Sequence, residues 1–176
     1  MESIKIREMM PEDAEELIAC MKRTGGETDN LTFGGEGLPI TVEQEREHLE
    51  QMRREEKSVH YGVWIDGALA GNGSLTGMPR RMSHYAEIGM AVVKSEWNKG
   101  IGGMLLAELI EYARRAGIEI LKLEVRSDNA AAIHLYEKYG FKRVGRFPAY
   151  FKIENEYFDF EIMCLDLRAG ADRENG

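Results

Sequence analysis

The sequence predicts a single α/β domain in which one sheet carries helices on its faces. Three observations support this: 176 residues are about one domain's length, strand and helix patterns alternate with short connections, and no linker divides the chain. We place the domain at residues 1–167. The charged, glycine-containing segment 168–176 is expected to be a disordered tail.

The first elements are predicted by local periodicity and by helix-start signals. Ile4 and Ile6 alternate with polar neighbours, as in a short strand. Pro11, followed by acidic residues, suits a helix N-terminus, and a capping box at Thr41 and Gln44 begins another helix. Together with five glycines in one stretch, these signals predict a strand over 3–8, a helix from about 11 to 22, a loop over 25–37 and a helix over about 42–57.

The remaining elements alternate between strand and helix. Asp66-Gly67 between two apolar runs is a strong hairpin signal, and the nearly continuous apolar run at 118–125 suits a strand covered on both faces. Gly117 and Gly140 follow helical repeats where left-handed caps belong. The expected strands are 59–65, 68–76, 85–93, 118–125, 141–152 and 156–167, and the expected helices are about 101–116 and 129–139.

Composition excludes several classes of protein. A net charge of −8 argues against nucleic-acid binding, which needs a basic face. No apolar run reaches the roughly 18 residues of a membrane helix, and the N-terminus lacks signal-peptide features. Cys20 and Cys164 are too few for a disulfide framework, and no His or Cys spacing is typical of a metal site. We therefore expect a cytoplasmic protein with neither a structural metal nor a membrane or nucleic-acid partner.

A glycine-rich turn over 97–103 joins a strand to an amphipathic helix. Glycines let a ligand approach the main chain closely, and the unpaired N–H groups of a helix N-terminus attract anions such as pyrophosphate. Lys99 would add a positive charge. The spacing fits neither of the two common phosphate-binding glycine motifs, since no Lys-Ser/Thr follows and Leu105 holds the third glycine position. The alternative is a turn whose glycines only allow close packing of helix and strand.

Asn129 and Tyr136 lie two turns apart on one face of the last predicted helix. An amide and a phenol on one stripe suit an elongated ligand. The simpler interpretation is that Asn129 caps the helix and Tyr136 is a core aromatic whose hydroxyl reaches water.

Taken together, three segments of the chain strongly resemble the GNAT N-acetyltransferase superfamily. They are Ala86-Glu87-Ile88-Gly89-Met90-Ala91-Val92, Trp97-Asn98-Lys99-Gly100-Ile101-Gly102-Gly103 and Asn129-Ala130-Ala131-Ala132-Ile133-His134-Leu135-Tyr136-Glu137-Lys138-Tyr139-Gly140-Phe141. The match is strongest over about 84–142, and the element order extends it over almost the whole chain. The resemblance implies a mixed, mostly antiparallel sheet of about seven strands flanked by about four helices.

The resemblance also implies acetyl-CoA as the donor, held between two splayed strands. Main-chain groups of one strand would pair with the pantetheine arm, N–H groups of the glycine turn would hold the pyrophosphate, and Asn129 would bind pantetheine. Trp97 departs from the family pattern, which has Arg or Gln at that position. The implied donor-binding residues are Met90, Ala91, Val92, Asn98, Lys99, Gly100, Ile101, Gly102, Gly103, Asn129, Ala132 and Tyr136.

The implied reaction is direct attack of an amine on the thioester. Tyr136 would protonate the departing thiolate, and an N–H of Met90 or Ala91 would stabilise the oxyanion. Glu87 matches the position of a general base in some relatives, although a strand glutamate in an ion pair is the alternative. His84 is the chemical rival for the base.

The acceptor is predicted only as a class. Acidic residues of the glycine loop (Glu27, Asp29 and Glu36) would attract a cationic amine unless the loop is merely solvated. Alternating residues of the last strand (Tyr157, Asp159 and Glu161) would meet the acceptor or serve the sheet alone.

We expect an N-acetyltransferase that acts on a primary amine of a small molecule or a protein. An amino acid or its analogue, a polyamine, an aminoglycoside and a protein N-terminus are all compatible. A non-catalytic acyl-CoA-binding sensor is the alternative, and a homodimer is compatible with the family.

Overall fold

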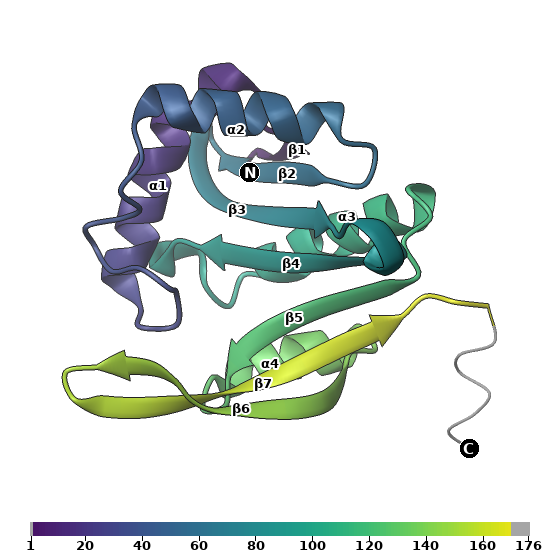
Figure 1. The fold of residues 1–176 in the computed structure, drawn as a ribbon. Helices are drawn as coiled ribbons and strands as arrows, with labels where there is room; N and C mark the ends of the chain where they lie inside the picture. The colour runs from purple at the N-terminus through teal and green to yellow at the C-terminus, as the bar shows by residue number, and fades with distance from the viewer. Residues whose placement is uncertain (1, 170–176) are drawn as a thin grey trace.

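The domain is built on one sheet of seven strands (Figure 1). The computed structural model describes residues 2–169, so residues 170–176 of the expected tail lie outside the described part. The strands are β1 (Ile4–Glu8), β2 (Val59–Ile65), β3 (Ala68–Gly77), β4 (Tyr85–Val92), β5 (Ile120–Arg126), β6 (Lys142–Ile153) and β7 (Glu156–Asp166). Their order across the sheet is β1-β2-β3-β4-β5-β7-β6, and β4–β5 is the one parallel pair among these strands.

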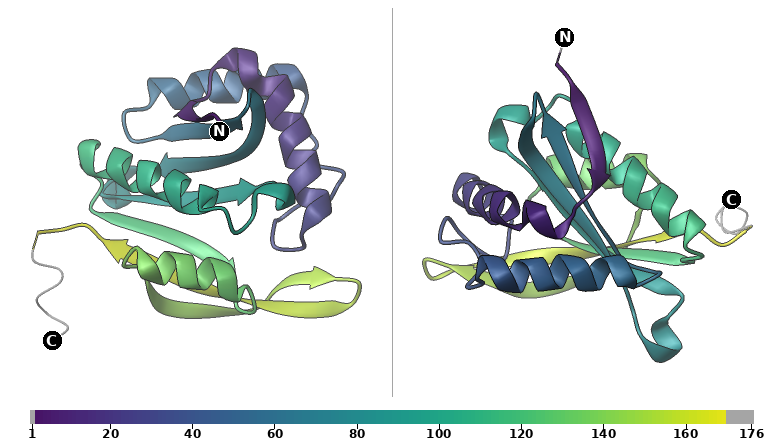
Figure 2. Two further views of the ribbon diagram at one scale, coloured as in Figure 1. Left: turned by 180° about the vertical axis from the view of Figure 1, so that it is seen from behind. Right: turned by 90° about the horizontal axis from the view of Figure 1, so that it is seen from above.

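Four helices cover the two faces of the sheet. They are α1 (Ala14–Glu27), α2 (Val42–Arg54), α3 (Ile101–Arg115) and α4 (Ala130–Lys138). Figures 1 and 2 show α1 and α2 on one face and α3 and α4 on the other. Each face has its own apolar core. Leu17 of α1 and Leu49 of α2 join Trp64 of the sheet in one core, and Leu105 of α3 joins Leu75 and Leu121 of the sheet in the other. Burial of these side chains, about 1.5–3 kcal/mol for each large aliphatic one, holds the layers together.

The predicted order of strands and helices is confirmed, but some of the predicted boundaries are wrong. The glycine loop was expected to start at residue 25, whereas α1 continues to Glu27. The reason is tertiary: Gly25 lies against Gly34, and a Cβ at Gly25 would collide with the Gly34 carbonyl oxygen. The returning loop packs on the last helical turn and favours helical backbone despite the glycines. Likewise, α2 ends at Arg54 rather than near 57, and β5 begins at Ile120 rather than at 118.

The central strands β4 and β5 separate after a short contact. Their pairing covers only Tyr85–Glu87 of β4 against 120–122 of β5. Beyond Glu87, the edge of β4 that faces β5 has no strand partner, while its other edge pairs with β3 as far as Val92. The backbone of residues 88–92 is therefore open on one side, next to the N-terminal ends of α3 and α4.

Candidate active site

One cavity lies at the N-terminal end of α3, beside the open edge of β4. Its volume is about 390 Å³. Eleven of the twelve residues expected to bind the donor line it; Lys99 does not. The eleven are Met90, Ala91, Val92, Asn98, Gly100, Ile101, Gly102, Gly103, Asn129, Ala132 and Tyr136. We call this space the donor cavity.

The glycine turn presents unpaired backbone donors to the donor cavity. Gly100 has φ +82° and caps α3, and Asn98 has φ +62°, a conformation that Asn tolerates better than most residues. The helical ladder starts with the Met104 N–H donating to the Gly100 carbonyl at 3.1 Å. The N–H groups of the preceding helical residues have no helical acceptor, so this end of α3 can receive an anion.

Trp97, which departs from the family pattern, takes part in the structure of the turn. Its indole Nε1–H donates to the Val92 carbonyl at 2.7 Å, which ties the turn back to the end of β4. Lys99 points elsewhere, because its ammonium is 3.0 Å from Glu96. An anion at this turn would therefore meet backbone N–H groups rather than the lysine.

Asn129 and Tyr136 both reach the donor cavity from α4. Asn129 caps the helix: its Oδ1 accepts the Ala132 N–H at 3.3 Å. Its amide nitrogen makes no hydrogen bond within residues 2–169 and is available to a ligand. The Tyr136 ring packs on Phe141, with centroids 5.8 Å apart, and burial raises the pKa of its hydroxyl to about 12. At Asn129, capping uses only the side-chain oxygen and leaves the amide nitrogen for a ligand, so the two roles are compatible.

A second cavity of about 480 Å³ lies on the α1–α2 side of the sheet. Its apolar and aromatic walls include Phe33, Phe151 and Phe160. We call it the acceptor cavity. The two cavities share eight lining residues, which mark where they meet: Thr24, Asn30, Leu31, Met90, Ala91, Asn129, Ala132 and Tyr136.

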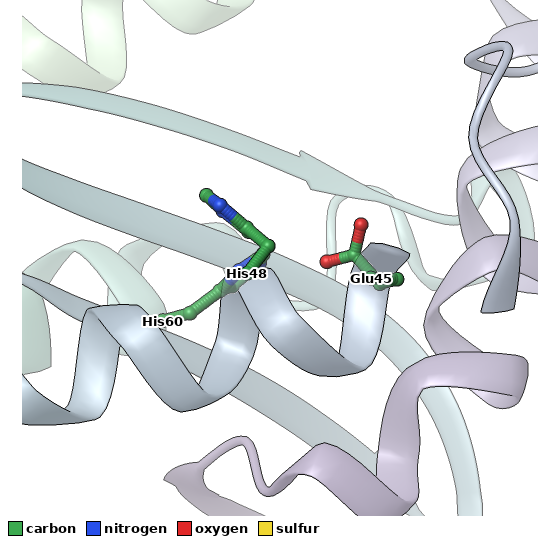
Figure 3. Close-up of side chains that lie close together, drawn as sticks. All are labelled: Glu45, His48 and His60. Carbon is green, nitrogen blue, oxygen red and sulfur yellow. The ribbon is translucent and has the colours of Figure 1, made fainter. Parts of the chain in front are cut away.

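Three titratable side chains gather in the wall of the acceptor cavity. Glu45 and His48 come from α2 and His60 from β2, and one ligating atom of each lies within 4.8 Å of the other two. Figure 3 shows the Glu45 carboxylate directed toward the two imidazoles. Within the described part of the chain, the side chains of Glu45 and His48 make neither a hydrogen bond nor an ion pair.

Burial governs the protonation of two of these groups. His60 is 8% exposed and Glu45 is 5% exposed. Burial lowers the pKa of His60, an effect that its hydrogen bond to Asn72 partly opposes. Burial raises the pKa of Glu45, and the nearby His48 opposes part of that rise. His60 Nε2 is 3.0 Å from Asn72 Oδ1, whereas His60 Nδ1 is buried without a hydrogen-bond partner among residues 2–169.

The two residues expected as general bases line neither cavity. The Glu87 carboxylate is 2.8 Å from the Lys122 ammonium, the ion pair that the sequence left as an alternative. Lys122 is also 3.4 Å from Glu124, which does line the acceptor cavity and accepts a hydrogen bond from Tyr150. His84 is exposed.

The acidic residues of the glycine loop lie outside both cavities. Glu27 accepts hydrogen bonds from the Lys94 N–H and from Arg23, which lower its pKa. Glu36 accepts the Gly34 N–H at 3.0 Å. Asp29 and Glu36 line a third hollow of about 310 Å³ between this loop and β6.

The alternating residues of β7 also lie outside the acceptor cavity. Glu161 pairs with Arg146 at 2.7 Å, and Asp159 accepts the Ala149 N–H at 2.8 Å. Tyr157 is 63% exposed. Glu161 and Asp159 thus have structural partners within the β6–β7 hairpin. The expected homodimer stays a prediction.

Two further sequence expectations concern cysteines and membranes. Cys20 and Cys164 are both free thiols. Among the described residues, none of the helices has the length and apolar character needed to cross a bilayer.

The cluster of Glu45, His48 and His60 was missed by sequence reasoning. One local signal existed: Glu45 and His48 are three residues apart, so a helix places them on one face. His60 had no such signal. It enters the cavity because the sheet register aligns His60 with Ser74 and Ser74 with Gly89, so that one row of residues crosses three strands.

Known proteins resemble this chain in sequence and in structure. The model of the acetyltransferase (GNAT) family matches residues 29–141. An acetyltransferase of the GNAT family from Streptococcus pneumoniae has a solved structure with a TM-score of 0.90 and 32% identity, covering 93% of this chain and 99% of that one.

Two curated relatives match over about half of this chain. L-amino acid N-acetyltransferase AaaT of Escherichia coli is 37% identical over 103 residues, which are 57% of this chain and 63% of the relative. N-alpha-acetyltransferase RimI of Mycobacterium tuberculosis is 35% identical over 96 residues, which are 53% of this chain and 59% of the relative. The matched segments thus span less than two thirds of the length of either relative.

Proposed function

This chain belongs to the GNAT acetyltransferase family, and on that premise we propose that it transfers the acetyl group of acetyl-CoA to a primary amine of a small molecule. The observation that carries the proposal is the meeting of two cavities at the open edge of β4. One cavity has the backbone donors for a pyrophosphate, and the other has room for an acceptor. Tyr136 lines both.

In the proposed reaction, the acceptor nitrogen attacks the thioester carbonyl from the acceptor cavity. Formation of the C–N bond turns the carbonyl oxygen into an oxyanion, and the carbonyl re-forms as the C–S bond breaks and CoA leaves as a thiolate. The proton of the acceptor ammonium passes to the base, and no covalent intermediate with the protein is needed. Main-chain N–H groups of Met90 or Ala91 stabilise the oxyanion. The Tyr136 hydroxyl stands beside the departing sulfur as a hydrogen-bond donor. The chain's part is to align the two substrates and to stabilise charge as it develops.

We retain Glu87 as the proposed base, acting through water because it lines neither cavity. The chain of charges from Glu87 through Lys122 to Glu124 supports this route, since it ends in the acceptor cavity wall. The test compares pH–rate profiles of Glu87→Gln and His84→Gln. Loss of the acidic limb in Glu87→Gln alone is expected. If neither variant loses it, both assignments fall.

The size and lining of the acceptor cavity support a small acceptor. About 480 Å³ is within the range of small-molecule sites. Its aromatic wall suits an amine with an apolar portion. AaaT is named for L-amino acids and RimI for N-alpha-acetylation. We therefore place amino acids and their analogues first in an acceptor panel and include peptides with free N-termini.

The donor site is tested by calorimetric titration with acetyl-CoA, using paired variants of Gly102. A Cβ at this position would meet Leu135 and Met90 side-chain atoms at 3.5 Å, an ordinary contact. Gly102→Ala should therefore keep the fold and most of the affinity. Gly102→Glu puts a carboxylate where the pyrophosphate would lie and should abolish binding. Equal affinity in Gly102→Glu and wild type would refute the donor site.

The reaction itself is tested by thiol release with the acceptor panel. Release of CoA with at least one amine, absent in Gly102→Glu, is expected. Tight donor binding without release for any amine or peptide would instead favour a non-catalytic sensor.

A further inference from the structure

We propose that Glu45, His48 and His60 form a binding site for a divalent transition-metal ion such as Zn²⁺ in the wall of the acceptor cavity. The site goes beyond acetyl transfer and does not depend on it. It also departs from the expectation drawn from sequence spacing, where no metal ligands were apparent.

The ligand types suit this class of ion. Two imidazoles and one carboxylate are typical ligands of Zn²⁺, whereas Ca²⁺ and Mg²⁺ prefer sets made of oxygen alone. Three protein ligands leave at least one coordination position for water or for a group in the cavity that all three residues line.

The distances are close to those that a metal ion needs. The three ligating atoms lie within 4.8 Å of one another. Some point in space is then within about 2.8 Å of all three, so a shift of about 0.7 Å by each ligand reaches the Zn–N distance of about 2.0–2.1 Å. His48 is exposed on the surface of α2, so its side chain is the freest of the three to make its share of that movement.

The unpartnered nitrogen of His60 is the second, independent observation. Nδ1 is buried without a hydrogen-bond partner in the described part of the chain, which is costly unless a water or an ion satisfies it. Nε2 is 3.0 Å from Asn72 Oδ1. An amide oxygen can only accept a hydrogen bond, so the proton of this bond lies on Nε2 of His60. His60 therefore donates from Nε2, and Nδ1 carries the free lone pair.

This arrangement resembles that of metal-bound histidines in general, whose second ring nitrogen is held by a hydrogen bond that fixes the tautomer and the ring orientation. Asn72 would supply that bond here. The neighbouring Glu45 carboxylate, buried without a partner among residues 2–169, would gain its counter-charge from the ion.

The test is calorimetric titration of tag-free, chelator-treated protein with Zn²⁺ alone. We expect one ion per chain with micromolar or tighter affinity. His48→Gln and Glu45→Gln should each weaken binding at least tenfold. His134→Gln, which removes an exposed histidine outside both cavities, should leave the affinity within twofold. Co²⁺ should give the visible absorption of a four- or five-coordinate site in wild type and lose it in His48→Gln.

Acetyl-CoA titration of the same variants separates the metal site from the proposed function. Neither Glu45 nor His48 lines the donor cavity, so donor binding should be unchanged in both variants, which also shows that they are folded. The proposal is overturned by a lack of saturable one-to-one Zn²⁺ binding in wild type. It is equally overturned if His48→Gln binds Zn²⁺ as tightly as wild type, or if His134→Gln loses as much affinity as His48→Gln.

Discussion

Replacing Tyr136 with phenylalanine removes a single hydroxyl from the junction of the two cavities. Within residues 2–169 that hydroxyl makes no hydrogen bond, and the ring contact with Phe141 is kept. Stability and acetyl-CoA affinity should therefore change little. Turnover should fall at least tenfold, which corresponds to about 1.4 kcal/mol of lost transition-state stabilisation.

The size of the expected fall in turnover follows from the acidity of the Tyr136 hydroxyl. Burial raises the pKa of Tyr136 to about 12, against about 8.5 for an ordinary thiol. Complete proton transfer to the thiolate would be unfavourable by about 3.5 pKa units, or about 5 kcal/mol. The phenol therefore acts as a hydrogen-bond donor to the negative sulfur, worth about 1.5–3 kcal/mol. That range predicts a loss of roughly 10- to 150-fold.

The assay is steady-state thiol release at saturating concentrations of both substrates, with acetyl-CoA affinity measured separately. Tyr112→Phe is the matched control, because the Tyr112 hydroxyl donates to the Ser58 and Glu56 carbonyls away from both cavities. The wild-type profile should show no basic limb from Tyr136 below about pH 11, since the phenol stays neutral. Turnover of Tyr136→Phe within twofold of wild type would refute the reasoning.

Three other predictions concern the glycine turn, the N-terminal ion pair and the last turn of α1. Trp97→Phe removes one hydrogen bond at 2.7 Å and should weaken acetyl-CoA binding about 2- to 10-fold by calorimetry; unchanged affinity would contradict this. The pKa of Asp13 is lowered by its guanidinium partner, so its contribution to stability is present above the unfolded pKa near 4 and is lost as pH falls through the lower folded value. Asp13→Asn should lower the free energy of unfolding by about 1–2 kcal/mol at pH 7 and should lose less stability than wild type below pH 4, as measured by denaturant titration. Equal pH dependence of stability in the variant and wild type would contradict this. Gly25→Ala should destabilise the fold by about 1–3 kcal/mol because its Cβ collides with Gly34. In Gly26→Ala the Cβ meets only an ordinary contact at 3.5 Å, so this variant should be neutral or stabilising. Thermal melts of both variants check the pair, and equal melting temperatures would contradict the prediction.

The elements were predictable wherever the signal is local. Asp66 and Gly67 both adopt positive φ, as the hairpin turn requires, and Gly140 has φ +94° after α4. The sheet order was not predictable in this way, because β7 lies between β5 and β6 and that placement depends on long-range packing. The extension of α1 through Gly25 escaped prediction for the same reason.

The two cavities also differ in how far the sequence predicts them. The donor cavity takes most of its lining from the contiguous turn 97–103 and from one face of α4. A local sequence pattern therefore predicts most of it. The acceptor cavity combines α2, β2 and β5 with the closing hairpin. Glu45 and His60 are fifteen positions apart and carry no shared periodicity. Only the strand register brings His60 into line with Gly89.

The short contact between β4 and β5 also bears on self-association. A sheet normally exposes two outer edges, but strands that part after three residue pairs expose two more in the interior of the molecule. Unpaired strand edges are the places where foreign strands add and aggregation begins. A ligand lying between β4 and β5 would cover both inner edges. The colloidal stability of this protein at high concentration should therefore depend on whether that gap is filled.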